Sequence, residues 1–105
     1  TEFHKGIDIA NARGTSIIAT ADGIVRYSKW LGGYGKLVVI EHGHGYLTFY
    51  GHLHEILIRN EQKIKKGDQI AKMGNTGVST GTHLHYEIRY LNKPQNPLNF
   101  VEKNN

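Results

Sequence analysis

Histidine is the residue whose number and spacing first suggest chemistry in this chain. The 105 residues include seven histidines, and six of them occur in H-x-H pairs. The pairs are His42 with His44, His52 with His54, and His83 with His85. Because side chains alternate between the two faces of a strand, both rings of a pair lie on one face, with Cα atoms about 6.6 Å apart. Such a pair can bind one metal ion, or one ring can bind the ion while the other flanks its water.

Local context distinguishes the pairs from one another. His44 lies between Gly43 and Gly45, where a polar residue with positive φ is typical of a hairpin turn. We interpret His42, at the end of an apolar run, as a hydrogen-bonded structural histidine. We expect His54, which begins a charged stretch, to be exposed. None of these three is therefore a preferred ligand.

The pair near the C-terminus has a more favourable setting. His83 and His85 follow a polar, glycine-containing segment at 77–82 and occupy alternate positions of a predicted strand. Leu84, Tyr86 and Ile88 fall on the opposite face of that strand. The pattern predicts two imidazoles that face a groove.

A further candidate site lies at the start of the chain, where His4 and Asp8 flank Gly6. A straight strand would place them about 13 Å apart, too far to share an ion. Gly6 permits a bulge that could bring them together. A histidine nitrogen and a carboxylate oxygen bind zinc at about 2.0 to 2.2 Å. With His85, this pair forms a three-ligand set that leaves a fourth position for water, as in catalytic zinc sites.

Composition narrows the function classes. Cysteine is absent, so any metal must be held by nitrogen and oxygen, and disulfides are excluded. The net charge is +4, yet the densest basic stretch, Lys63 to Lys66, is interrupted by Ile64 and lacks interleaved aromatics, which argues against nucleic acid. The longest strongly apolar run, 37–40, is far shorter than the ~20 residues of a membrane span. No signal peptide is present, and a start at Thr1 predicts a piece of a longer protein.

The apolar pattern predicts an all-β fold. Short alternating runs rich in isoleucine and tyrosine are separated by glycine-containing turns at regular intervals. The expected strands are 16–20, 23–29, 36–42, 46–51, 55–58, 69–73 and 84–90. We expect Pro94 and Pro97 to end the last strand. The spacing is typical of a compact antiparallel sandwich or partly open barrel, here with a substrate groove.

Three motifs in order carry a family resemblance. They are His4-x-Gly-x-Asp8, Tyr50-Gly51-His52-Leu53, and Gly81-Thr82-His83-Leu84-His85-Tyr86-Glu87. Together with the intervening glycine turns, the chain resembles the lysostaphin-type, or LytM-type, zinc metalloendopeptidases over nearly its whole length. Position 82 is threonine where that family often has proline, and only three residues precede His4.

The resemblance implies one peptidase domain over residues 1–105, the C-terminal part of a longer protein whose upstream domains would complete the groove. It implies a hydrolase of bacterial peptidoglycan cross-links in the periplasm, at the cell surface or outside the cell. By motif position, His4, Asp8 and His85 would bind one zinc ion per chain. His52 and His83 would be the catalytic histidines that assist attack by a zinc-bound water. One assignment makes His83 the general base and lets His52 orient that water or stabilise the oxyanion; the motif spacing leaves open which histidine has which role.

Other functions fit less of the sequence. A non-catalytic regulator of cell-wall hydrolysis could use the same fold, but all five motif positions carry the expected side chains. A lipoyl or biotinyl carrier has similar hairpin sequences at 21–25 and 67–74, yet the lysine that a carrier modifies at a hairpin tip is missing. Passive zinc binding would leave the His52 motif without a role.

Overall fold

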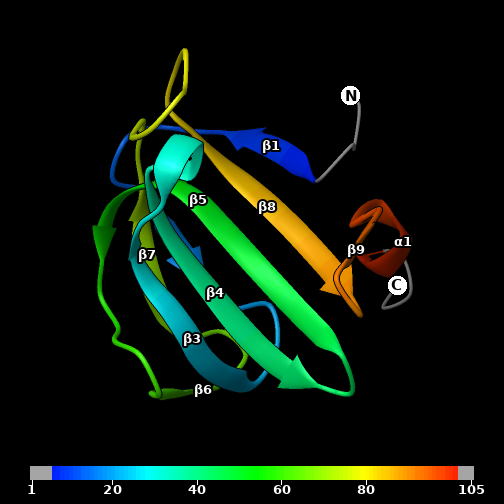
Figure 1. Ribbon diagram of the computed structural model, residues 1–105. Coiled ribbons are helices and arrows are strands. Elements are labelled where there is room, and N and C mark those ends of the chain that lie inside the picture. The colour runs from blue at the N-terminus through cyan, green and yellow to red at the C-terminus, as the bar shows by residue number, and fades with distance from the viewer. Residues whose placement is uncertain (1–5, 102–105) are drawn as a thin grey trace.

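A computed structural model of the chain describes residues 6–101, and most of that range is β-strand (Figure 1). The elements in order are β1 Ile7–Ala10, β2 Ser16–Ile18, β3 Gly23–Trp30, a 3₁₀ turn Gly32–Tyr34, β4 Lys36–Gly43, β5 Tyr46–Ile56, β6 Lys63–Ile64, β7 Gln69–Met73, β8 His83–Tyr90, β9 Lys93–Gln95 and α1 Leu98–Val101. No helix within the described range is long and apolar enough to cross a membrane.

All strand pairs are antiparallel and belong to one sheet that does not close into a barrel. The strand order is β1-β8-β5-β4-β3-β6, with β7 also paired to β5, β2 to β7, and β9 to β8. Figure 1 shows β4, β5 and β8 side by side as the long central strands, with β1 beyond β8. The first and eighth strands are therefore neighbours although they stand at opposite ends of the sequence.

The central strands bury apolar side chains on both faces. On one face a large cluster includes Val38 and Ile40 of β4 with Tyr50 of β5. On the other face a smaller cluster contains Leu37, Val39 and Phe49. The near-continuous apolar run of β4 follows from this arrangement, because successive residues serve opposite faces. The central strands therefore have packed side chains on both faces.

The predicted all-β, antiparallel fold class is confirmed, but several boundaries differ. Residues 55–58 do not form a strand of their own, because β5 continues to Ile56 and pairs with β7 there. The short strands β1, β6 and β9 and the helix α1 are not among the elements predicted from the sequence. Short elements carry too few periods of alternation to be recognised.

The expected role of Pro94 was wrong. β8 ends in a two-residue turn in which Leu91 and Asn92 have φ of 50° and 67°. Pro94 lies inside β9, opposite Arg89. A short outer strand tolerates proline because the missing N–H faces away from the ladder.

Candidate active site

Pairing of β1 with β8 brings the two ends of the chain together. Asp8 lies opposite His85 in the ladder, and Asp8 Oδ1 is 2.9 Å from His85 Nδ1. The strands approach closely because residue 6 is glycine: a Cβ there would collide with the backbone carbonyl of Tyr86 and lie 2.8 Å from Cγ of Glu87. Gly6 therefore serves close contact between strands. The predicted partner His4 lies outside the described residues.

A buried carboxylate holds the other side of the His85 ring. His85 Nε2 is 2.7 Å from Oε2 of Glu87, whose side chain is fully buried. Tyr34 donates its hydroxyl hydrogen to the same oxygen at 2.7 Å, and Arg89 donates to Oε1 at 2.9 Å. Burial would raise the pKa of Glu87, but hydrogen bonds from His85, Tyr34 and Arg89 hold it below its ordinary value. Glu87 is therefore a carboxylate at neutral pH.

The same contacts set the charges of the neighbouring groups. The hydrogen bond to Glu87 raises the pKa of His85 above its ordinary value, against the effect of burial. Burial and the bond to Glu87 raise the pKa of Tyr34 to about 12, so its hydroxyl remains a donor. His85 lies between two carboxylates, with one ring nitrogen on each.

His83 occupies the same face of β8, as period-two alternation requires. Its Nδ1 donates a hydrogen bond to the carbonyl of Gly81 at 2.8 Å. Its Nε2 lies 3.5 Å from Asp8 Oδ1. The ring therefore keeps its hydrogen on Nδ1 when neutral, and its free nitrogen points toward the pair formed by Asp8 and His85.

His52 reaches the cluster through an unusual backbone conformation. β5 pairs with β8 up to Gly51 and with β7 from Leu53, so His52 lies where the strand changes partners. In regular alternation His52 would point to the same face as Tyr50, into the large core cluster. Its φ of 61° interrupts the alternation, and its ring centre lies 4.7 Å from that of His83. Non-glycine residues in this region are strained and concentrate at functional sites.

A loop carbonyl fixes the His52 ring. Nδ1 of His52 donates to the carbonyl of Thr76 at 2.6 Å, which leaves Nε2 without a hydrogen in the neutral ring. Burial lowers the pKa of His52, although the bond to Thr76 opposes this effect. The ring is therefore a neutral hydrogen-bond acceptor at neutral pH.

The cluster opens into a small hollow of about 260 Å³. Its lining consists of Gly33, Tyr34, His52, Val78 and His85. The loops that contain Gly35 and Gly77 form the rim. Their backbones lie in direct contact, and a Cβ on either glycine would collide with the other loop. Val78, 83% exposed, stands at this rim.

The donors present suit a zinc ion. Ligands on a tetrahedral ion at about 2.0 to 2.1 Å lie near 3.3 Å apart, close to the 2.9 Å between Asp8 Oδ1 and His85 Nδ1. The Glu87 carboxylate behind His85 matches the outer partner that metal-binding histidines usually have. Within residues 6–101 no three His, Cys, Asp or Glu side chains gather as a metal-binding group. The third predicted ligand, His4, is not among these residues.

Comparison with known proteins identifies the family of this chain. Residues 2–97 match Peptidase family M23. The chain belongs to this family. The catalytic domain of the antimicrobial peptidase lysostaphin from Staphylococcus simulans superposes with a TM-score of 0.89 and 27% identity, covering 94% of this chain and 79% of that one. The resemblance to lysostaphin-type peptidases is thus confirmed.

Two further comparisons bear on activity. A zinc containing peptidase from Vibrio cholerae superposes with a TM-score of 0.85 and 40% identity, covering 88% of this chain and 28% of that one. The murein hydrolase activator NlpD of Escherichia coli K12 is 50% identical over 99 residues, 93% of this chain. The M23 chain spans only 26% of that relative.

The remaining histidines of this M23 chain lie elsewhere. His44 adopts φ of 53° in the β4–β5 turn, as predicted. His42 Nδ1 donates to the carbonyl of Asp22 at 2.6 Å, and Nε2 is 2.7 Å from the Thr48 hydroxyl, which confirms the structural interpretation. The expectation for His54 was wrong: it is half-buried, its backbone lies against Gly74, and Nη2 of Arg13 is 3.4 Å from its Nδ1.

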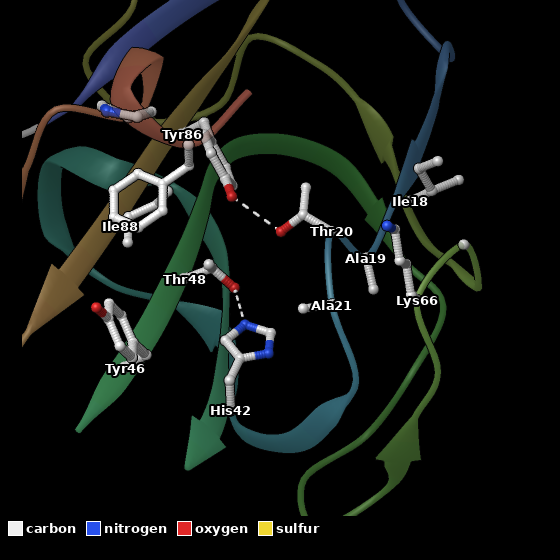
Figure 2. A pocket seen from close by; sticks show the side chains of 13 residues that line it. Ile18, Ala19, Thr20, Ala21, His42, Tyr46, Thr48, Lys66, Tyr86 and Ile88 are labelled. Carbon is white, nitrogen blue, oxygen red and sulfur yellow. Dashed lines mark hydrogen bonds between the residues drawn. The ribbon is translucent and has the colours of Figure 1, made fainter. Parts of the chain in front are cut away.

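A larger hollow of about 650 Å³ lies on the opposite face of β8 (Figure 2). Tyr86 and Ile88 contribute to its wall, on the face away from His85. Figure 2 shows the Tyr86 hydroxyl bonded to Thr20 and the His42 ring bonded to Thr48. The candidate histidines His52, His83 and His85 do not line it.

Sequence reasoning missed the residues that support the M23 site. Glu87 was noticed only as part of a motif, although its position two residues after His85 already placed it on the same face. Tyr34 and Arg89 reach it from a different loop and from the next position on that face. The carbonyl of Thr76 gives no sequence signal, because every residue has one.

Proposed function

We propose that this M23 chain is a zinc-dependent endopeptidase that hydrolyses the peptide cross-links of bacterial peptidoglycan. One observation carries the proposal: Asp8 and His85, 77 residues apart, lie 2.9 Å from each other beside the rings of His83 and His52. A nitrogen and an oxygen donor adjacent to two further histidines form a set that suits metal-assisted hydrolysis.

We assign the metal to Asp8, His85 and His4, one zinc per chain. When bound, zinc acts as a Lewis acid that polarises a carbonyl and makes water nucleophilic at neutral pH. Asp8 and His85 supply one oxygen and one nitrogen, the donor types that zinc accepts in the absence of cysteine. The structural similarity to a zinc containing peptidase from Vibrio cholerae supports this assignment.

The other two histidines of the cluster, His83 and His52, transfer and orient protons. His83 keeps its hydrogen on Nδ1 through Gly81, so its Nε2 can accept a proton from water and later donate it to the leaving amine. His52, neutral and bonded through Nδ1 to Thr76, presents an acceptor at Nε2. Of the two roles expected for His52, this geometry favours orienting the water, because an oxyanion needs a donor.

The relatives support the proposed substrate class and location. Lysostaphin is an antimicrobial peptidase, and NlpD of Escherichia coli is a murein hydrolase activator. We therefore place this chain in the bacterial cell envelope or outside the cell, with peptidoglycan as its partner. Because it spans 26% of NlpD, further domains of a longer protein would act with it.

Three variants test the proposal on the protein and on purified peptidoglycan. His85→Ala should lose both zinc and cleavage, measured by metal analysis and by release of new amino groups. His83→Ala should retain zinc and lose cleavage by about 10² to 10⁴-fold, since it removes a general base. His54→Ala is the control and should change neither. Equal zinc loss in the first two variants, or zinc-free wild-type protein purified without chelator, would contradict the assignment.

A second function is favoured by the relation to NlpD. At 50% identity to a murein hydrolase activator, the chain could regulate a separate hydrolase on the same fold. The two functions separate in one assay: peptidoglycan is incubated with the chain alone, with another murein hydrolase alone, and with both. Cleavage by the chain alone that chelator abolishes supports the peptidase. Stimulation of the second enzyme without intrinsic cleavage, unchanged in His83→Ala, supports the regulator.

A further inference from the structure

We propose that Glu87, clamped by Tyr34 and Arg89, is the positioning residue that fixes the imidazole of His85 with its hydrogen on Nε2, so that Nδ1 faces Asp8 and the metal. The inference rests on the proposed zinc site and assigns three residues that touch neither metal nor substrate in that proposal.

The first observation is that the Glu87 carboxylate is fully occupied. Its Oε2 accepts from His85 and Tyr34 at 2.7 Å each, and its Oε1 accepts from Nε of Arg89 at 2.9 Å. The side chain has no exposed surface. A buried carboxylate must be paired in this way, since an unpaired buried charge is very costly. Because the Glu87 carboxylate is ionised, both of its oxygens are hydrogen-bond acceptors, and the His85 nitrogen that faces it must carry a hydrogen.

The second observation is that the side chains around the Glu87 carboxylate are themselves held in place. The Arg89 guanidinium also donates to the Tyr34 hydroxyl at 3.0 Å, which closes a ring of hydrogen bonds around Glu87. The same guanidinium stacks 4.0 Å above the Phe49 ring, in the smaller core cluster. The orientation of the carboxylate is therefore set by packed side chains rather than by solvent.

The consequence reaches the opposite side of the His85 ring. An imidazole that donates from Nε2 to a carboxylate keeps Nδ1 as the nitrogen available for a metal ion, and the ring cannot flip without losing that bond. Asp8 lies on the Nδ1 side at 2.9 Å. Glu87 thus determines both the tautomer and the direction of the ligand.

Two substitutions and a matched control test the inference. Glu87→Gln keeps the shape of the side chain but replaces one of the two acceptor oxygens by an NH₂ group. That NH₂ group would face a hydrogen-bond donor from His85, Tyr34 or Arg89. Tyr34→Phe keeps the carboxylate and the ring and removes one donor, which protects the test if Glu87→Gln does not fold. Tyr27→Phe is the control, because its hydroxyl donates to the Trp30 carbonyl, away from Glu87.

Two readouts apply to each protein. The zinc dissociation constant is measured by competition with a chromophoric chelator. The protonated nitrogen of His85 is read from long-range ¹H–¹⁵N NMR correlations of the metal-free chain at alkaline pH, where the ring is neutral. Glu87→Gln should weaken zinc binding by about 10 to 100-fold, the usual effect of removing an outer partner of a ligating histidine. It should also convert His85 from Nε2–H to a mixture of tautomers, with smaller changes in Tyr34→Phe and none in Tyr27→Phe.

The outcomes separate this inference from the proposed function. Wild-type zinc affinity and an unchanged Nε2–H tautomer in both Glu87→Gln and Tyr34→Phe would overturn the inference while leaving the zinc site intact. If the wild-type chain binds no zinc, the proposed function fails, and the NMR comparison alone decides whether Glu87 positions His85. A folded Tyr34→Phe protein with weaker zinc binding and a mixed tautomer supports it even if Glu87→Gln is unfolded.

Discussion

Substitution of Gly6 by alanine should disturb the site without touching a functional side chain. The new Cβ would collide with the Tyr86 carbonyl oxygen and lie 2.9 Å from the carbonyl carbon, where ordinary contact begins at 3.4 Å. The two strands must therefore separate by at least about 0.5 Å, the difference between these two backbone distances. Because Asp8 is two residues along the same strand and pairs with His85, the separation also lengthens their 2.9 Å contact.

The cost follows from overpacking against backbone. Inserting a methyl group into a tight contact costs typically about 1 to 3 kcal/mol. In a chain of this size each kcal/mol lowers Tm by about 4 to 8 °C, so a cost of about 2 kcal/mol predicts a fall of about 8 to 16 °C. Zinc affinity should fall together with stability, since one of the two described donors moves.

Thermal unfolding followed by circular dichroism, with chelator present, measures the first effect, and chelator competition measures the second. Gly81→Ala is the matched control, because Gly81 has open space where a Cβ would be added. The control should keep wild-type Tm and zinc affinity. A Gly6→Ala protein with the same Tm and zinc affinity as wild type would refute the argument that glycine is needed for close approach of β1 to β8.

Further predictions concern pH, a supporting loop and the core. Burial raises the pKa of Tyr86 and raises the pKa of Tyr34 to about 12, whereas an unfolded tyrosine ionises near 10. The stability that these hydroxyls contribute is complete below about pH 10 and is lost as pH rises through their folded pKa values. Urea unfolding between pH 8 and 11.5 should show this decline, and a flat profile would contradict it. Thr76→Val removes the hydroxyl that bonds to the Leu53 carbonyl and shifts the carbonyl that holds His52, so peptidoglycan cleavage should fall with zinc content unchanged; a parallel loss of zinc would show that the loop supports the metal instead. Ile40→Ala empties a fully buried position and should cost about 2 to 5 kcal/mol in urea unfolding; a cost below 1 kcal/mol would mean that the core refills the space.

The part of the site that could be predicted from sequence is the part governed by local alternation. Period two placed His83 and His85 together on one face, and the core residues Leu84, Tyr86 and Ile88 confirm the other face. The same rule would point His52 away from them, because nothing local signals its positive φ. That conformation arises where β5 exchanges β8 for β7, which only the three-dimensional pairing determines.

Long-range contacts account for the remaining differences. Gly6 was expected to supply a kink, but its role is to let one strand approach another across the sheet. Glu87 reads as an ordinary charged residue in the sequence, yet it is fully buried, because Arg89 pairs with its charge and Tyr34 donates a hydrogen bond to it. Arg89 is two residues away but Tyr34 is 53 residues away, so a short window around Glu87 does not contain all the partners that make its burial possible.

The position of β1 at the end of the strand order has a consequence for biosynthesis. Asp8 is synthesised before its partner His85, which follows 77 residues later. Closing a segment of that length costs about 4 kcal/mol of chain entropy beyond a constant, which the completed sheet must offset. A nascent or truncated chain that ends before β8 therefore carries Asp8 without its partner His85. The proposed zinc site can therefore assemble only after translation has passed residue 85.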